Sequence, residues 1–140
     1  MSAVCFTVVG VAQPKGSLRA FVKPGARFAT VTEDNLRTRP WAALVTDAAR
    51  QAVGDAMAFP DGGVHLAVAF ILPRPKSLPK RVTTHTKRPD LDKLVRAVKD
   101  AMTGVVWRDD SQVVELVTAK RYCGGVEQPH ARISVCRAIA

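Results

Sequence analysis

Aspartates gather in one part of this basic sequence, residues 87–115, where they could hold a divalent cation. The chain has 140 residues, twelve of them acidic, and a net charge of +9. Five of the acids fall within positions 90–110, namely Asp90, Asp92, Asp100, Asp109 and Asp110. Carboxylate oxygens suit hard cations such as Mg²⁺, and a cation in a basic surface can act on phosphate. Helix capping and turn formation explain the same aspartates equally well, so the pattern leaves both interpretations open.

The first two aspartates are predicted to stand where a helix begins. The apolar residues after them follow helical spacing: Leu91, Leu94, Val95, Val98 and Met102. Pro89 disfavours helix at Arg88, so the helix should start near Asp90 and end at Gly104. Two positions along a helix differ by about 200°, so Asp90 and Asp92 converge only if Asp90 is still extended.

The other two adjacent aspartates, Asp109 and Asp110, precede a predicted strand. Residues 112–121 are rich in β-branched and aliphatic side chains and favour β structure. The predicted order is therefore an extended aspartate, a second aspartate in a first helical turn, a loop with two aspartates, and a strand.

Charge and composition indicate what the chain binds. The excess of cations points to a polyanion, with nucleic acid ahead of an anionic membrane surface. No apolar run of about 18 residues is present, so no membrane span is expected. The three cysteines are an odd number without metal-ligand spacing, which fits a reducing cytoplasm and an absence of zinc.

Two basic stretches are candidates for contact with phosphates. The first, 15–27, carries Lys15, Arg19, Lys23 and Arg27 with no acid among them. The second, the basic loop 73–88, has three prolines and no acid, so it is not expected to form a helix or strand. Its cations are Arg74, Lys76, Lys80, Arg81, Lys87 and Arg88. A solvated surface is the alternative for both stretches; the charge of the whole chain favours contact with nucleic acid.

The remaining pattern predicts one α+β domain over residues 1–140. Strands are expected at 4–11, 18–22, 27–31, 64–72, 112–121 and 130–139, with a hairpin between the second and third and another between the last two. A first helix is expected at 38–57, with Thr38 as its cap. Each helix has one apolar stripe, so both should pack against a mixed sheet.

The order of these motifs resembles the RusA-type Holliday junction resolvases, a family common in phages and prophages. The resemblance rests on PDLDKLVRAVKDAMTG, then WRDDSQVVEL, then Lys120, and extends to PKGSLRAF and PRPKSLPKR. Two positions depart from the family pattern: Lys93 replaces its asparagine, and Arg96 replaces its lysine. Arg96 keeps the positive charge, but a guanidinium does not donate a proton near neutral pH.

The resemblance implies an Mg²⁺-dependent endonuclease that cuts branched DNA, mainly four-way junctions, as a homodimer with two active sites. Mn²⁺ is a possible substitute. The implied metal ligands are Asp90, Asp92 and Asp110, with Asp109 as an alternative. Arg96, Lys93 and Lys120 are the candidates for neutralising the scissile phosphate.

Two alternatives remain open at the level of sequence. Pro89-Asp90 fits the start of another endonuclease motif, PD…(D/E)xK, but Glu115 and Lys120 are five residues apart and point to opposite faces of a strand. A non-catalytic DNA- or RNA-binding module, with the aspartates as caps, is the second. Dependence on a divalent ion would distinguish a nuclease from such a module.

Overall fold

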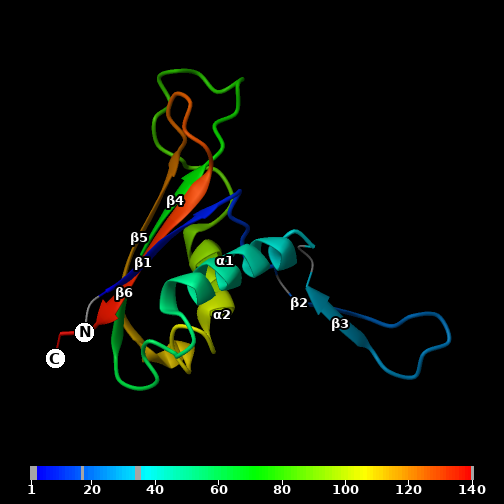
Figure 1. The fold of residues 1–140 in the computed structure, drawn as a ribbon. Coiled ribbons are helices and arrows are strands. Elements are labelled where there is room, and N and C mark those ends of the chain that lie inside the picture. The colour runs from blue at the N-terminus through cyan, green and yellow to red at the C-terminus, as the bar shows by residue number, and fades with distance from the viewer. Residues whose placement is uncertain (1–2, 17, 34–35, 140) are drawn as a thin grey trace.

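The computed structural model describes residues 3–16, 18–33 and 36–139 and confirms the α+β class (Figure 1). The elements in chain order are β1 (Val4–Val9), β2 (Leu18–Phe21), β3 (Thr30–Glu33), α1 (Thr38–Val53), β4 (Val64–Leu72), α2 (Leu91–Met102), a 3₁₀ turn η1 (Asp110–Gln112), β5 (Val113–Tyr122) and β6 (His130–Arg137).

Strand β4 lies inside a mixed four-stranded sheet of order β1-β6-β4-β5. It pairs with β5 in parallel and with β6 antiparallel. The predicted hairpin between β5 and β6 is therefore wrong, because β4 separates them. Alternate residues of β4 from Val64 to Leu72 are at most 2% exposed, so the most apolar strand takes the inner position. The chain between β4 and β5 contains α2, which is the kind of crossover that parallel pairing requires.

Both helices cover the same face of this sheet, as Figure 1 shows. The strand residues on that face pair in register, for example Val68 with Ile133 and Phe70 with Ala131. They form one core with residues of α1 and α2, including Trp41, Val45, Leu94 and Val98. On β5 the same face carries Thr118, Lys120 and Tyr122, which pair with Val68, Phe70 and Leu72. Lys120 and Tyr122 therefore point toward the side of the sheet where α2 lies.

The expected cap of α1 is wrong. Helix α1 has Arg37 at its N-cap position and no side-chain capping hydrogen bond. The Thr38 hydroxyl instead donates to the Pro14 carbonyl at 2.7 Å, which joins the helix start to the segment 11–16. The helix also ends at Val53, earlier than predicted, and Gly54 follows with a φ of 76°.

The basic stretch 15–27 leads into an arm that extends from the body (Figure 1). Its predicted hairpin is confirmed, with β2 paired antiparallel to β3, although β3 begins at Thr30 rather than at 27. Lys23 and Arg27 lie exposed at its turn. The side chain of Arg19 lies outside what the structure describes. Among the described residues, none of the helices has the length and hydropathy needed to cross a bilayer.

Candidate functional site

Asp90 and Asp92 adopt the local conformation that the sequence predicts. Asp90 stands at the N-cap of α2 in an extended conformation, with φ −68° and ψ 138°, and Asp92 lies in the first helical turn. The Asp90 side chain makes no capping hydrogen bond, although aspartate at this position usually does. Both residues are exposed, and within the described chain neither carboxylate has an ion-pair partner. Capping therefore does not explain Asp90.

Asp109 behaves in the opposite way. Its Oδ1 accepts a hydrogen bond from the Ser111 backbone N–H at 2.9 Å and caps η1. The hydrogen bonds from the Ser111 backbone and side chain lower the pKa of the Asp109 carboxyl. Asp110 follows as the first residue of η1, and its carboxylate does not serve as the cap. The capping interpretation thus holds for Asp109 but not for its neighbour.

Gln112 fixes this turn to the body, a role that the sequence reasoning did not assign. Its Oε1 accepts from the backbone N–H groups of Arg108 and Asp109 at 2.9 and 3.0 Å. Its Nε2 donates to the carbonyls of Phe59 and Gly62, both at 3.0 Å. The sequence contained a signal for this role, because a glutamine three residues after a capping aspartate forms a capping box. Gln112 therefore positions the turn that carries Asp110.

Helix α2, η1 and β5 line a hollow of about 370 Å³, here named the Asp92–Asp110 hollow. Its lining residues are Asp92, Val95, Arg96, Lys99, Asp110 and Leu116. Asp90 does not line it and lines the loop groove described below, so its extended conformation does not bring it together with Asp92 as expected. In the described parts of the chain, no three His, Cys, Asp or Glu side chains gather closely enough to hold a metal ion. The structure therefore brings together two of the three predicted ligands, with Arg96 beside them.

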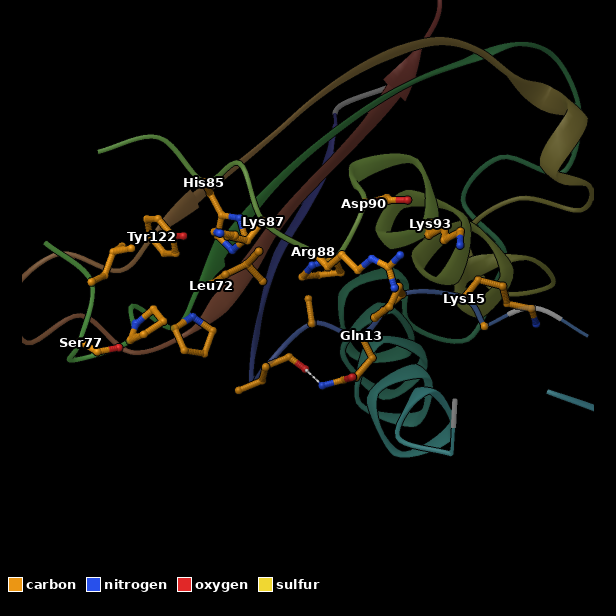
Figure 2. Close-up of a pocket in the computed structure, with 18 of the residues that line it drawn as sticks. Gln13, Lys15, Leu72, Ser77, His85, Lys87, Arg88, Asp90, Lys93 and Tyr122 are labelled. Carbon is orange, nitrogen blue, oxygen red and sulfur yellow. Dashed lines mark hydrogen bonds between the residues drawn. The ribbon is translucent and has the colours of Figure 1, made fainter. Parts of the chain in front are cut away.

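A second depression, the loop groove, runs on the other side of the α2 start (Figure 2). It measures about 820 Å³ and lies between the segment 11–16 and parts of the chain from 72 to 93. Figure 2 shows Tyr122 and His85 toward one end and Asp90, Lys93 and Lys15 toward the other. Lys93 thus belongs with Asp90 in this groove and not with Arg96 in the hollow.

The basic loop has no helix or strand, as predicted, but it is braced from within. The Arg74 guanidinium donates to the carbonyls of Pro79 and Val82, both at 2.8 Å. It also lies over the Tyr122 ring at 5.4 Å, and the His85 ring stacks on Tyr122 at 4.3 Å between centroids. The contact of Arg74 with phosphate stays a prediction; in the structure its guanidinium has these contacts within the chain.

Lys120 holds the other end of the loop. Its ammonium donates to the carbonyls of Lys87 at 2.7 Å and Pro89 at 2.9 Å, immediately before Asp90. The role of Lys120 toward the scissile phosphate stays a prediction; the contacts that the structure shows hold the backbone just before Asp90. Burial, and then the nearby Lys120 charge, hold the pKa of His85 below its usual value, against weaker backbone contacts that raise it.

The remaining residues that were predicted to contact DNA differ in their surroundings. Lys76, Lys80 and Arg81 are exposed on the loop, and Lys87 and Arg88 are exposed where they line the groove. Lys15 lines the groove too, but its ammonium forms an ion pair with Asp100 at 3.3 Å. The same ion pair accounts for Asp100, the remaining aspartate of the cluster, which fastens helix α2 to the segment 11–16.

Comparison with known proteins identifies the family of this chain. The family model described as Endodeoxyribonuclease RusA matches residues 12–135, which include Lys120 and every lining residue of both depressions except Val11. The chain is also 28% identical to the uncharacterised protein YqaN of Bacillus subtilis (strain 168), over 96% of each chain. With a match across most of its length, the chain belongs to the RusA endodeoxyribonuclease family.

Proposed function

We propose that this chain is a divalent-cation-dependent endonuclease that cuts branched DNA, with four-way junctions as its main substrate. The observation that carries the proposal is the Asp92–Asp110 hollow. Two carboxylates and two cations, Arg96 and Lys99, line it together. Within the part of the chain that the structure describes, these two carboxylates have no ion pair, whereas Asp109, in the same turn as Asp110, is used as a cap. Membership of a family of endodeoxyribonucleases supports the same conclusion.

The donor set fits a hard cation. Magnesium is commonly bound through one or two carboxylates, with water and substrate phosphate oxygens completing the shell. Asp92 and Asp110 would hold it, with Asp90 as a neighbouring carboxylate on the far side of the helix start. Such a cation, when bound, polarises a phosphoryl oxygen and lowers the pKa of water. Oxygen-only donors favour Mg²⁺, with Mn²⁺ as a substitute, over zinc.

The chain's own residues supply positioning and charge. Arg96 and Lys99 stand beside the carboxylates and stabilise the negative charge that develops on a phosphate during hydrolysis. Because a guanidinium keeps its proton, Arg96 acts as a fixed charge and not as an acid. Gln112 holds the turn of Asp110, and Lys120 holds the backbone before Asp90. The exposed cations of the loop attract the DNA backbone from either side of the cut.

The proposal includes a homodimer that joins through the sheet face opposite the helices. This face has a shallow depression of about 530 Å³ lined by small residues, among them Ala67, Ala69 and Ala119. Val117, on the same face, is 61% exposed. The alanines leave this face shallow, and Arg132 and Ser134 also line it. A shallow, partly apolar face suits a second copy of itself, because a twofold interface needs self-complementarity. Sedimentation of the chain and of Val117→Glu tests this: a dimer that Val117→Glu leaves intact joins elsewhere.

The proposed activity is tested with a synthetic four-way junction labelled on each strand. We expect cleavage with Mg²⁺ or Mn²⁺, none with excess chelator, and little cutting of a linear duplex of the same sequence. Binding without cutting under all metal conditions would favour the non-catalytic module. Equal cutting of junction and duplex would leave a nuclease but remove the preference for branches.

A further inference from the structure

The loop groove has two chemically different ends, and most of its lining residues have no role in the proposed cleavage. The end near α2 carries the cations Lys15 and Lys93 beside the Asp90 carboxylate. Arg88 lies between this end and Lys87, which Figure 2 shows beside His85. Away from the α2 end, the walls are apolar and are built from Leu72, Pro73, Pro75, Leu78 and Pro79, with the rings of His85 and Tyr122. A ligand that fits must therefore combine an anion with a flat apolar group.

The groove is formed in advance on both sides. On one side, the segment 11–16 is held by Thr38 to the Pro14 carbonyl and by the Lys15 backbone N–H, which donates to the Lys93 carbonyl at 2.9 Å. On the other, Arg74 and Lys120 fasten the loop. A volume of about 820 Å³ lies in the range of small-molecule sites, about 300–1,000 Å³. Preformed walls reduce the entropic cost of binding.

Paired duplex DNA presents phosphates but keeps its bases stacked inside, so it would leave the apolar end of the groove empty. At a branch point, bases can leave the stack at lower cost. An unstacked nucleotide offers both required parts, a phosphate for the cations and a base for the apolar walls. The unsatisfied Nδ1 of His85 is a further polar atom at that end: it is buried and has no hydrogen bond of good geometry.

We propose that the loop groove binds one unstacked nucleotide of the DNA strand that passes the Asp92–Asp110 hollow. The base packs against the proline-rich wall, while Lys87, Arg88 and Lys93 hold its phosphates. Asp90 and Asp92 adjoin at the start of α2, so this nucleotide lies next to the phosphate to be cut. The inference rests on the proposed function. It implies that the groove determines which phosphate of the strand reaches the Asp92–Asp110 hollow.

The test uses Tyr122, the only tyrosine of the chain, as a reporter. The full chain is labelled with fluorotyrosine, and its ¹⁹F signal is followed without added metal, so that no cutting occurs. The probes are a tetranucleotide of thymidines and an abasic tetranucleotide with the same phosphates. We expect the thymidine oligomer to shift the Tyr122 signal and to bind about tenfold more tightly than the abasic one.

Two variants make the result specific. Ser77→Trp places a bulky ring in the groove without removing a known contact, and it should abolish the thymidine preference while phosphate-driven binding remains. Thr84→Ala, an exposed loop position that does not line the groove, should keep the preference. Equal affinities and shifts for the two oligomers, or a preference that survives Ser77→Trp, would overturn the inference. Absence of binding to junctions by the unmodified chain would instead refute the proposed function.

Discussion

The two depressions beside the start of α2 differ in what their charged groups already contact. Around the loop groove, Arg74 and Lys120 donate to backbone carbonyls, and Lys15 pairs with Asp100. In the Asp92–Asp110 hollow, opposite charges line one space, yet no ion pair of 4.0 Å or less joins them. Charges of the first kind shape the molecule. Those of the second kind stay available for a cation and a phosphate, so chemistry is expected in the hollow. Affinity for DNA is expected from the exposed cations of the groove, Lys87, Arg88 and Lys93.

The largest effect should come from the carboxylates of the hollow. We expect Asp92→Asn and Asp110→Asn each to lower cutting about a thousandfold or more, because a ligand charge is lost. We expect Asp90→Asn to abolish cutting as well, because the family resemblance makes Asp90 the third carboxylate ligand. Junction affinity should hold or rise, since negative charge near the phosphates is removed. Labelled-junction cleavage and gel-shift binding measure the two quantities.

Asp109→Asn is the matched control for these variants. Asparagine caps as well as aspartate does, so η1 should stay folded and cutting should continue. If Asp109→Asn is inactive while Asp110→Asn cuts normally, the roles of the two neighbours are exchanged and the comparison between capping and acting carboxylates fails.

Arg96 should give the next largest effect. Arg96→Ala should slow the chemical step about a hundredfold, because a fixed charge beside the phosphate is lost, with much less change in affinity. Arg96→Lys should keep most activity, since either cation serves electrostatically. Single-turnover cleavage of a saturated junction isolates this step. An unchanged rate for Arg96→Ala would remove Arg96 from the site. A much faster rate for Arg96→Lys would mean that arginine at this position lowers the activity.

Much of this arrangement was predictable, because it depends on local pattern. The apolar stripe from Leu91 predicted α2, Pro89 predicted where this helix starts, and the apolar run 64–72 predicted β4. The predicted hairpin of β5 and β6 was wrong, because a short connection suggests a hairpin, whereas tertiary packing places β4 between these two strands. The contacts of Lys120, Arg74 and Gln112 with distant carbonyls were missed for the same reason. The sequence shows where a cationic or amide side chain occurs. The backbone group that this side chain contacts is decided only when distant parts of the chain come together in the fold.

The basic loop should change affinity and not chemistry. Replacing Lys80, Arg81, Lys87 and Arg88 with alanine should weaken binding to all DNA shapes, and the slope of log K against log[salt] should fall by roughly 0.9 for each lost phosphate contact. The rate at saturating enzyme should change little. Arg50→Ala, an exposed cation on α1, serves as a control for general loss of charge. A salt slope that does not move would leave these side chains solvated and would blur the distinction between the groove and the hollow.

The smallest expected effect concerns the pH dependence of stability at the aromatic end of the groove. Burial and the Lys120 charge lower the pKa of His85 in the folded chain below its ordinary value of 6.5. Between these two pKa values the unfolded chain binds more protons, so stability should fall as the pH drops from 6.5 through the folded pKa. His85→Phe keeps a ring beside Tyr122 but cannot titrate. The urea midpoint of the unmodified chain should therefore decline relative to that of His85→Phe on acidification, and the difference should level off below the folded pKa. A constant difference from pH 7.5 to 5 would show that the loop does not hold His85 against Lys120, and the bracing of the groove would then rest on Arg74 and the Lys120 hydrogen bonds alone.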